Sequence, residues 1–211
     1  MSTDQPLPIA GHDPPERADA ARNRARILAA VRALLRERTP CEVSIDDIAA
    51  AAEVGKGTIY RRFGDRGRLM QAVLDDREQA FQAAVMFGEP PLGPGAPPDE
   101  RLTAFLCALV DELEQVGDLV AEVETGQQWL LSPPQRFRRM HVQMLLDQAR
   151  PDLDGEVLAE ALLAPLTAEG YHYQRRHAGH SCERIKACMR SLARAVLSCA
   201  PGGPTTVELA G

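Results

Sequence analysis

The eight residues KGTIYRRF, at positions 56–63, concentrate side chains that can donate hydrogen bonds to a polyanion. Lysine and arginine carry positive charge, and the threonine and tyrosine hydroxyls add neutral donors, a set that suits phosphate oxygens and base edges. As a helix the segment would be about 12 Å long at 1.5 Å per residue, close to the width of the DNA major groove, about 12 Å. A solvated surface helix explains the charges equally well. The neighbouring elements must therefore distinguish a DNA-binding helix from an ordinary surface helix.

A short helix with a clear start signal precedes this segment. Ser44 can cap it, and Asp47 lies three residues on, at the spacing of a capping box. Val54 and Gly55 then break the helical pattern, so the sequence predicts two short helices joined by a tight turn. The first of them has an apolar face that would pack inward, formed by Ile45, Ile48, Ala49 and Ala52.

Longer helices are predicted on both sides of this pair. The first begins near Arg17, and Thr39-Pro40 is expected to end it, because the residue before proline avoids the helical region. After a break at Gly64, Asp65 would cap a helix over 66–85. A long helix followed by two short ones is typical of a helix-turn-helix unit, whose last helix enters the major groove. The apolar stripe of the first helix consists of Ile27, Leu28, Val31, Leu34 and Leu35.

The run at positions 44–69 resembles the signature of the TetR family of bacterial transcriptional regulators. With its supporting helix, the match covers about a quarter of the chain, and the rest agrees only in the number and order of helices. The resemblance implies an all-α fold of about nine helices, in which an N-terminal three-helix helix-turn-helix domain carries a C-terminal helical domain for ligand binding and dimerisation. It also implies a sequence-specific regulator, a dimeric repressor that a small-molecule effector releases from operator DNA.

The resemblance also implies roles for single residues. Ser44 would cap its helix and reach a phosphate, Tyr60 would bond a phosphate, and Arg66 would meet one at the start of the next helix. Gly57 would let the backbone approach the DNA closely. The residues expected to face the DNA are Lys56, Thr58, Arg61 and Arg62, and those expected in the domain core are Ile48, Val54, Ile59 and Phe63.

Two positions depart from the family pattern. Glu53 stands where the family usually has glycine in the turn, and a left-handed backbone there would cost a non-glycine residue about 1–2 kcal/mol. Gly67 stands where the family usually has glutamate, which weakens the start of the following helix.

The charge distribution agrees with DNA binding at one end of the chain. The net charge of the 211 residues is −6, yet residues 17–72 hold 12 basic against 7 acidic residues, while residues 73–211 hold 12 against 20. The first residues show no basic start and no apolar core, so no signal peptide is predicted. No run of about 20 apolar residues predicts a membrane span. The sequence therefore predicts a cytoplasmic protein, and its five cysteines are expected as free thiols.

The domains are predicted from composition and periodicity. Residues 1–16 and 201–211 are expected to be disordered tails, 17–86 the DNA-binding domain, and 87–200 the effector-binding and dimerisation domain. Within the second domain a loop rich in proline and glycine over 88–98 would precede helices near 99–116, 118–130, 133–149, 154–177 and 182–199. Pro165 is expected to kink the fourth of these.

By resemblance, the last two helices would pair with those of a second subunit, and an effector would bind among the helices from 99 to 177. Two apolar faces support the pairing, although an intramolecular core explains them too: Val157, Leu158, Ala161, Leu162 and Leu166 form one, and Ile185, Met189, Leu192, Ala193, Val196 and Leu197 form the other. The candidate effector-site residues, which could equally be plain core, are Phe105, Leu109, Trp129, Phe137, Met140, His141, Met144 and Tyr171.

Other functions are weaker alternatives. A ligand-independent repressor or an activator of the same fold stays open. A metal- or redox-responsive sensor is more remote, because a solvated helix end explains the nearby imidazoles and thiol better than a metal site, and nothing marks a cysteine with a lowered pKa. No catalytic motif or cofactor site is recognised, so no enzyme and no cofactor is predicted. The residues weighed as metal ligands are His172, His177, His180 and Cys182.

Overall fold

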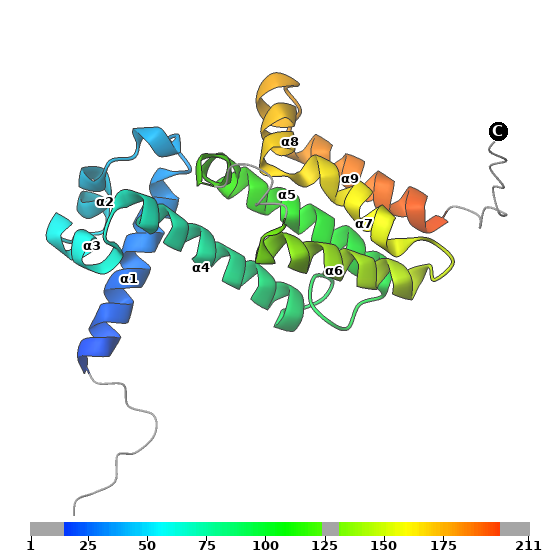
Figure 1. Ribbon diagram of the computed structural model, residues 1–211, viewed down its shortest axis with the longest axis horizontal. Coiled ribbons are helices and arrows are strands. Elements are labelled where there is room, and N and C mark those ends of the chain that lie inside the picture. Colours follow the sequence, from blue (N-terminus) through cyan, green and yellow to red (C-terminus); the bar gives the residue numbers. More distant parts are fainter. Residues whose placement is uncertain (1–14, 124–130, 199–211) are drawn as a thin grey trace, which may run out of the picture. The chain divides into compact units, whose positions relative to one another are not determined.

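The computed structural model describes residues 15–123 and 131–198. Within these ranges the chain is helical and holds no strand (Figure 1), which confirms the all-α prediction. The chain divides between Leu69 and Met70 into two compact units, here called unit 1 (residues 1–69) and unit 2 (residues 70–211). The division falls within one continuous helix, α4 (Arg66–Phe87), whereas the sequence prediction placed the domain boundary after residue 86.

Unit 1 holds the three predicted helices, followed by the first turn of α4. They are α1 (Pro15–Leu34), α2 (Ile45–Ala51) and α3 (Lys56–Phe63). The prediction that α1 reaches Thr39 is wrong, because the helix ends at Leu34. There the amides of Glu37 and Arg38 both bond to the Leu34 carbonyl, which closes a tight turn before a 3₁₀ turn at Pro40–Glu42.

The apolar positions predicted for unit 1 are buried. Ile48 and Ile59 are almost fully enclosed and Phe63 nearly so, while Val54 is half-buried at the turn. From α1, three of the five stripe residues are buried, namely Ile27, Leu28 and Val31. Burying this apolar surface, at about 25 cal/mol per Å², fixes α3 with one face inward and the other in water.

Unit 2 contains the rest of α4 and five further α-helices: α5 (Pro98–Val123), α6 (Pro133–Ala149), α7 (Gly155–Leu163), α8 (Ala168–His172) and α9 (Cys182–Ser198). Two separate helices were predicted over 99–116 and 118–130, but α5 runs unbroken through the point between them. Gly117 costs a helix only about 1 kcal/mol, less than its helix-forming neighbours provide. Residues 124–130 lie outside the described ranges.

The predicted helix over 154–177 is also corrected. Pro165, expected to kink it, interrupts it: α7 ends at Leu163, a 3₁₀ turn covers Ala164–Leu166, and Thr167 is extended, with ψ 158°. The Thr167 hydroxyl then accepts a bond from the Gly170 amide at 3.0 Å and caps α8. Proline removes a helical donor and crowds the preceding turn, and a capping residue close behind starts a new helix, which leaves the axis of α7 (Figure 1).

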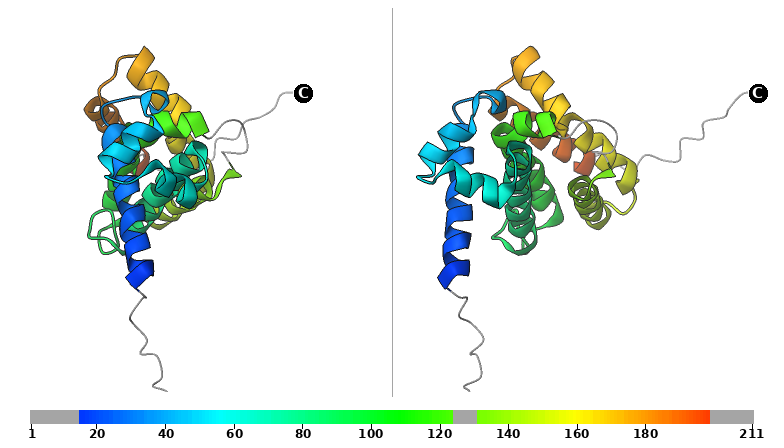
Figure 2. Two further views of the ribbon diagram at one scale, coloured as in Figure 1. Left: turned by 90° about the vertical axis from the view of Figure 1, so that its left-hand side faces the viewer. Right: turned by 60° about the vertical axis from the view of Figure 1, so that its left-hand side comes forward.

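The helices of unit 2 surround one apolar core. α5 packs against α6, α8 and α9, and α6 packs against α7. The turned views show these green, yellow and orange helices gathered into one bundle (Figure 2). None of the described helices is long and apolar enough to cross a membrane. The core side chains that α4, α5 and α6 contribute include Phe81, Phe105, Leu106, Leu109 and Leu145.

The loop between α4 and α5, rich in proline and glycine, is folded onto unit 2. Leu92 packs against the core, and the Gly93 amide donates to the Glu89 carbonyl at 3.0 Å. A Cβ at Gly93 would come within 1.8 Å of the Gly88 carbonyl oxygen, so only glycine fits this approach of two backbone segments.

Candidate functional site

The start of α2 has the predicted capping box. The Asp47 amide donates to the Ser44 hydroxyl oxygen at 3.1 Å, and the Ser44 amide donates to the Asp47 carboxylate at 3.1 Å. The reciprocal bonds satisfy two donors at the helix start. Asp65 likewise accepts from the Arg68 amide at 2.8 Å, as predicted for the start of α4. Local bonds predicted from the sequence therefore fix the start of α2 and the start of α4, on either side of the helix-turn-helix.

The turn between α2 and α3 places Glu53 in the left-handed region, with φ 50°. This is the backbone for which glycine is suited, and a non-glycine residue there costs about 1–2 kcal/mol. Arg26 of α1 holds the turn, because its guanidinium donates to the carbonyl oxygens of Ala52 at 2.6 Å and Glu53 at 3.1 Å. The Arg26 contact was not predicted from sequence. Carbonyls at a helix end need such donors.

The outer face of α3 presents most of the side chains predicted to face DNA. Tyr60, Arg61 and Arg62 are exposed, and Thr58 is half-buried. Neither arginine forms an ion pair with any residue that the structure describes. Lys56 is exposed but pairs with Asp46 of α2. This set of five residues, Lys56, Thr58, Tyr60, Arg61 and Arg62, is called the α3 surface below.

Two other predicted contact residues have different surroundings. A Cβ at Gly57 would meet no atom within 4 Å, so packing within the described residues does not require glycine there. Arg66 is half-buried, and its guanidinium donates to the carbonyl oxygens of Val43, at 3.3 Å, and Pro40. These bonds tie the start of α4 to the segment before α2, a structural role that the sequence did not reveal.

The predicted effector-site residues fall into three groups. Phe105, Phe137 and His141 come together: the His141 ring lies 4.8 Å from that of Phe105 and 5.9 Å from that of Phe137, centre to centre. Leu109 belongs to the same core. Met140 and Met144 are exposed in the single chain, and Trp129 lies outside the described residues.

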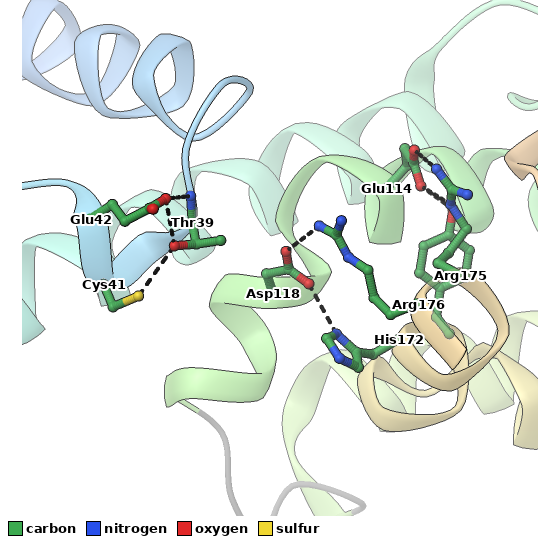
Figure 3. Close-up of polar contacts among 9 residues, drawn as sticks. Thr39, Cys41, Glu42, Glu114, Asp118, His172, Arg175 and Arg176 are labelled. Atoms are coloured by element: carbon green, nitrogen blue, oxygen red, sulfur yellow. Dashed lines mark hydrogen bonds and ion pairs between the residues drawn. The ribbon is translucent and has the colours of Figure 1, made fainter. Parts of the chain in front are cut away.

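Tyr171, the last of them, bonds to Glu114 of a polar cluster. Figure 3 shows Glu114, Asp118, His172, Arg175 and Arg176 of this cluster. The Tyr171 hydroxyl donates to Glu114 at 2.5 Å, and Arg175 binds the same carboxylate through two nitrogens, at 2.6 and 2.7 Å. Arg175 holds the pKa of Glu114 below its usual range. One turn further along α5, Asp118 accepts from Arg176 at 3.0 Å and lies 3.2 Å from the His172 Nδ1.

These pairs hold the π-helical turn at Tyr173–His177 against α5. They also account for His172, one of the four residues weighed as metal ligands. Among the residues that the structure describes, no three histidine, cysteine, aspartate or glutamate side chains are grouped as a metal site.

A second polar group, which sequence reasoning found only through His141, lies between α5 and α6. Gln135 and His141 of α6 are 7% and 6% exposed, and Gln135 Nε2 and His141 Nε2 have no hydrogen-bond partner. The Nε atoms of Arg101 and Arg138 are also buried and unpartnered. Burial and, next, the charge of Arg101 lower the pKa of His141 from 6.5 to about 4, so the ring is neutral at pH 7. Arg101 bonds to Val85 of α4 and Arg138 pairs with Glu78, seven residues earlier, so the four residues are spread along the helices. They are called the interior polar residues.

The chain matches known proteins most clearly in unit 1 and the first turns of α4. Residues 27–73 match the family model described as bacterial regulatory proteins, tetR family. Over these residues the chain is similar to the TetR family. A transcriptional repressor of the helix-turn-helix type from Mycobacterium tuberculosis is 47% identical over 51 residues, which make up 24% of this chain and 27% of the relative. The match therefore spans about a quarter of that curated relative.

Solved structures resemble this chain over most of its length. A putative TetR-family regulator from Rhodococcus sp. is 21% identical, with a TM-score of 0.63 over 83% of this chain and 99% of that one. RolR, solved in complex with resorcinol, is 23% identical, with a TM-score of 0.55 over 88% of this chain and 98% of its own. At these identities the likeness shows a shared fold.

Proposed function

We propose that this chain is a dimeric transcriptional regulator that binds operator DNA through α3 and loses affinity for it when a small molecule binds unit 2. The observation that carries the proposal is the α3 surface, where Arg61 and Arg62 are exposed and unpaired within the described residues. Guanidinium groups presented by a capped helix-turn-helix suit guanine edges and phosphates. A regulator of this kind would act in the cytoplasm, with the chromosome.

Gly57 supports the same surface. Because nothing within 4 Å would obstruct a Cβ there, the described fold gives no reason for glycine, whereas a close approach of DNA to the start of α3 does. Thr58 and Tyr60 supply neutral donors beside the arginines, and Ser44 stands at the start of α2. Arg66, whose guanidinium binds two carbonyls, contributes by holding α4 in place, so its predicted phosphate contact carries less of the proposal.

A selected operator and three variants test the DNA site. Duplexes bound by the full chain are enriched from a random pool, and affinities are then measured by fluorescence anisotropy. We expect Arg61→Ala to weaken the selected site by about 1–3 kcal/mol if it reads a base edge, and Tyr60→Phe to weaken all sequences alike. Arg136→Gln removes an exposed charge from α6 and should change nothing. Equal affinities for Arg61→Ala and the wild type would place the recognition surface elsewhere.

The dimer is proposed from exposed apolar side chains on α7 and α9. Val157 is 61% exposed and Leu192 39% exposed, and Ala161 and Cys188, one turn away from them, are exposed as well. Large apolar side chains left in water on two helices that contact each other favour a partner surface. Two such pairs, one from each subunit, would bring two α3 helices to half-sites about one helical turn apart, roughly 34–36 Å, or a multiple of it.

A charge at the proposed dimer surface tests this assembly. We expect Leu192→Glu to shift the full chain towards monomer in sedimentation velocity and to weaken operator binding, because each half-site alone offers few contacts. Arg184→Glu, also exposed on α9 but towards its start, serves as the control. A Leu192→Glu protein that sediments as the wild type does would remove this surface from the proposal.

Ligand response is supported by the interior polar residues and by a ligand-bound protein of similar fold. RolR was solved with resorcinol, a precedent for a small molecule in this fold. Two of these residues contact α4, Arg101 at Val85 and Arg138 at Glu78, and α4 begins at Arg66. A ligand can change DNA affinity only by binding one form of the protein better than another, and a coupling of about 1–3 kcal/mol corresponds to about 5–150-fold.

A further inference from the structure

An acidic side chain of α2 is paired with one of the three cations of the α3 surface. Asp46, in the first turn of α2, forms an ion pair with Lys56, the first residue of α3. Arg61 and Arg62 form no ion pair with any residue that the structure describes. Within the described residues, Lys56 is therefore the one cation of the α3 surface whose charge the protein already balances.

The start of α2 does not by itself account for Asp46. Its neighbour Asp47 makes the capping contacts, since it accepts from the Ser44 amide at 3.1 Å and its carboxylate lies 3.5 Å from the Arg38 guanidinium. Lys56 is the only described residue with which the Asp46 carboxylate forms an ion pair or a hydrogen bond. Both side chains are more than half exposed, and a pair this exposed adds little to stability. The helix dipole favours an acid in the first turn but requires no lysine on the following helix.

The pair changes what Lys56 can do at a DNA surface. A free lysine that neutralises a phosphate releases condensed counterions, a gain that is the same for every sequence. Lys56 obtains that gain only by leaving Asp46, whose carboxylate would then be uncompensated close to the polyanion. An ammonium has three N–H donors, so Lys56 can keep one on Asp46 and direct the others to a base edge. The pair therefore disfavours contact with the backbone and permits contact with a base.

We propose that Asp46 is a specificity-determining residue of the DNA site, which holds Lys56 away from the phosphate backbone and leaves its remaining donors for a base edge. Asp46 acts through Lys56, as a positioning residue, and need not touch the DNA itself. The proposal rests on the DNA-binding function above and concerns the same surface. Its consequence is that the wild-type chain binds DNA of random sequence more weakly than its exposed cations alone would allow.

The first test replaces Asp46 by asparagine, which keeps the size of the side chain and removes its charge. Affinities of the full chain for the selected operator and for a random-sequence duplex are measured by fluorescence anisotropy over a series of salt concentrations. We expect Asp46→Asn to bind the random duplex about 3–10-fold more tightly at about 0.1 M salt, and to steepen the logarithmic salt dependence by about 0.9 for each bound subunit. The operator should gain less, so the ratio of operator affinity to random-duplex affinity should fall.

Two further variants separate the ion pair from the net charge. Glu53→Gln removes an exposed carboxylate from the turn between α2 and α3, where it lies 3.7 Å from Arg26 and forms no described ion pair with Lys56. It should steepen the salt dependence by less than half as much as Asp46→Asn does. Lys56→Gln should flatten the salt dependence for the random duplex by about 0.9 per subunit in the Asp46→Asn background, and by much less in the wild type. Such non-additivity arises only when two residues interact.

The possible results separate this proposal from the function on which it rests. If the full chain selects no duplex from the random pool, the DNA-binding function fails and this role of Asp46 with it. If an operator is selected but Asp46→Asn binds both duplexes with the salt dependence of the wild type, only the role of Asp46 fails. Equal gains for Asp46→Asn and Glu53→Gln, or additive effects of the Asp46 and Lys56 changes, would assign the effect to net charge and overturn the proposal. An Asp46→Asn protein with a lower Tm and an unchanged affinity ratio would show a merely structural role.

Discussion

Two ion pairs, one in each unit, show how differently this molecule uses positive charge. Lys56 and Asp46 pair on the surface of unit 1, where their side chains are 58% and 65% exposed. Arg138 and Glu78 pair inside unit 2, where theirs are 13% and 17% exposed. Water screens the first pair and hardly reaches the second. Losing one partner therefore costs the folded state more free energy in the buried pair than in the exposed one.

The difference bears on the two classes of ligand proposed for the two units. Exposed cations such as Arg61 and Arg62 cost little when unpaired, because water solvates them until a polyanion arrives. Cations in the interior must be compensated continuously, by a carboxylate of the protein or by a bound molecule. The exposed set therefore suits a large polyanion such as DNA, and the interior set suits a small molecule of defined charge and shape.

The largest expected effect comes from removing the carboxylate of the interior pair. We expect Glu78→Gln to lower the free energy of unfolding by about 2–4 kcal/mol, because Arg138 keeps its charge and loses its partner. Asp46→Asn, the matched change on the surface, should lower it by less than about 0.5 kcal/mol. Urea unfolding of both variants at pH 7 measures the two values.

Equal losses of unfolding free energy for the two variants would contradict the difference between the buried and the exposed ion pair. A small loss for Glu78→Gln would mean that water reaches Arg138, and a large loss for Asp46→Asn would mean that the Lys56 pair organises the start of α3.

A smaller effect is expected from His141 and depends on pH. Its folded pKa, about 4, lies below the unfolded value of 6.5, so the unfolded chain binds more protons between these limits. The contribution of His141 to stability is therefore complete above pH 6.5 and is lost as the pH falls towards 4, by about 1–3 kcal/mol. His141→Gln, which does not titrate, should flatten this part of the stability profile.

Carboxylates also titrate near the lower limit, so the quantity to compare is the difference between wild type and His141→Gln at each pH. A difference that is constant from pH 8 to pH 4 would show that His141 keeps an ordinary pKa and is well hydrated. The burial of this ring near the charge of Arg101 would then be wrong.

A third change concerns the turn that presents the α3 surface. Glu53→Gly should raise the free energy of unfolding by about 0.5–1 kcal/mol, because glycine adopts φ 50° without strain while the carbonyl bonds from Arg26 remain. Ala50→Gly, on the exposed side of α2, should lower it by a similar amount. Thermal unfolding of the two variants measures whether each change raises or lowers the stability. A destabilised Glu53→Gly protein would show that the glutamate side chain holds the turn.

The sequence predicted the parts of this molecule that local bonds determine. Ser44 with Asp47, Gly64 with Asp65 and the apolar positions of α2 and α3 are sufficient to place the helix-turn-helix, because each acts over three or four residues. The sequence predicted the position of the disruption at Pro165 correctly, but it predicted a kink where the helix in fact ends. Whether proline kinks or ends a helix depends on the next capping residue, and Thr167 supplied one.

What the sequence did not predict depends on contacts between distant segments. Arg26 and Arg66 appeared as members of a basic segment, yet both bind backbone carbonyls more than 20 residues away. Gln135 and Arg138 gave no signal beyond their spacing of three residues on one helix, which also places His141 on the buried side. Met140 and Met144 were chosen for their adaptable side chains, a property that says nothing about the direction in which a helix faces.

The folded loop between α4 and α5 determines where this protein can be divided. Its composition suggests a tether, which an engineer would cut or lengthen to obtain a free ligand-binding module. Leu92 packs on the core, and Gly93 fits closely against Gly88, so an insertion there would disturb packed structure. A fragment beginning at residue 88 would also lose Phe81 and Val85 from its own core, and a stable module must therefore carry α4 with it.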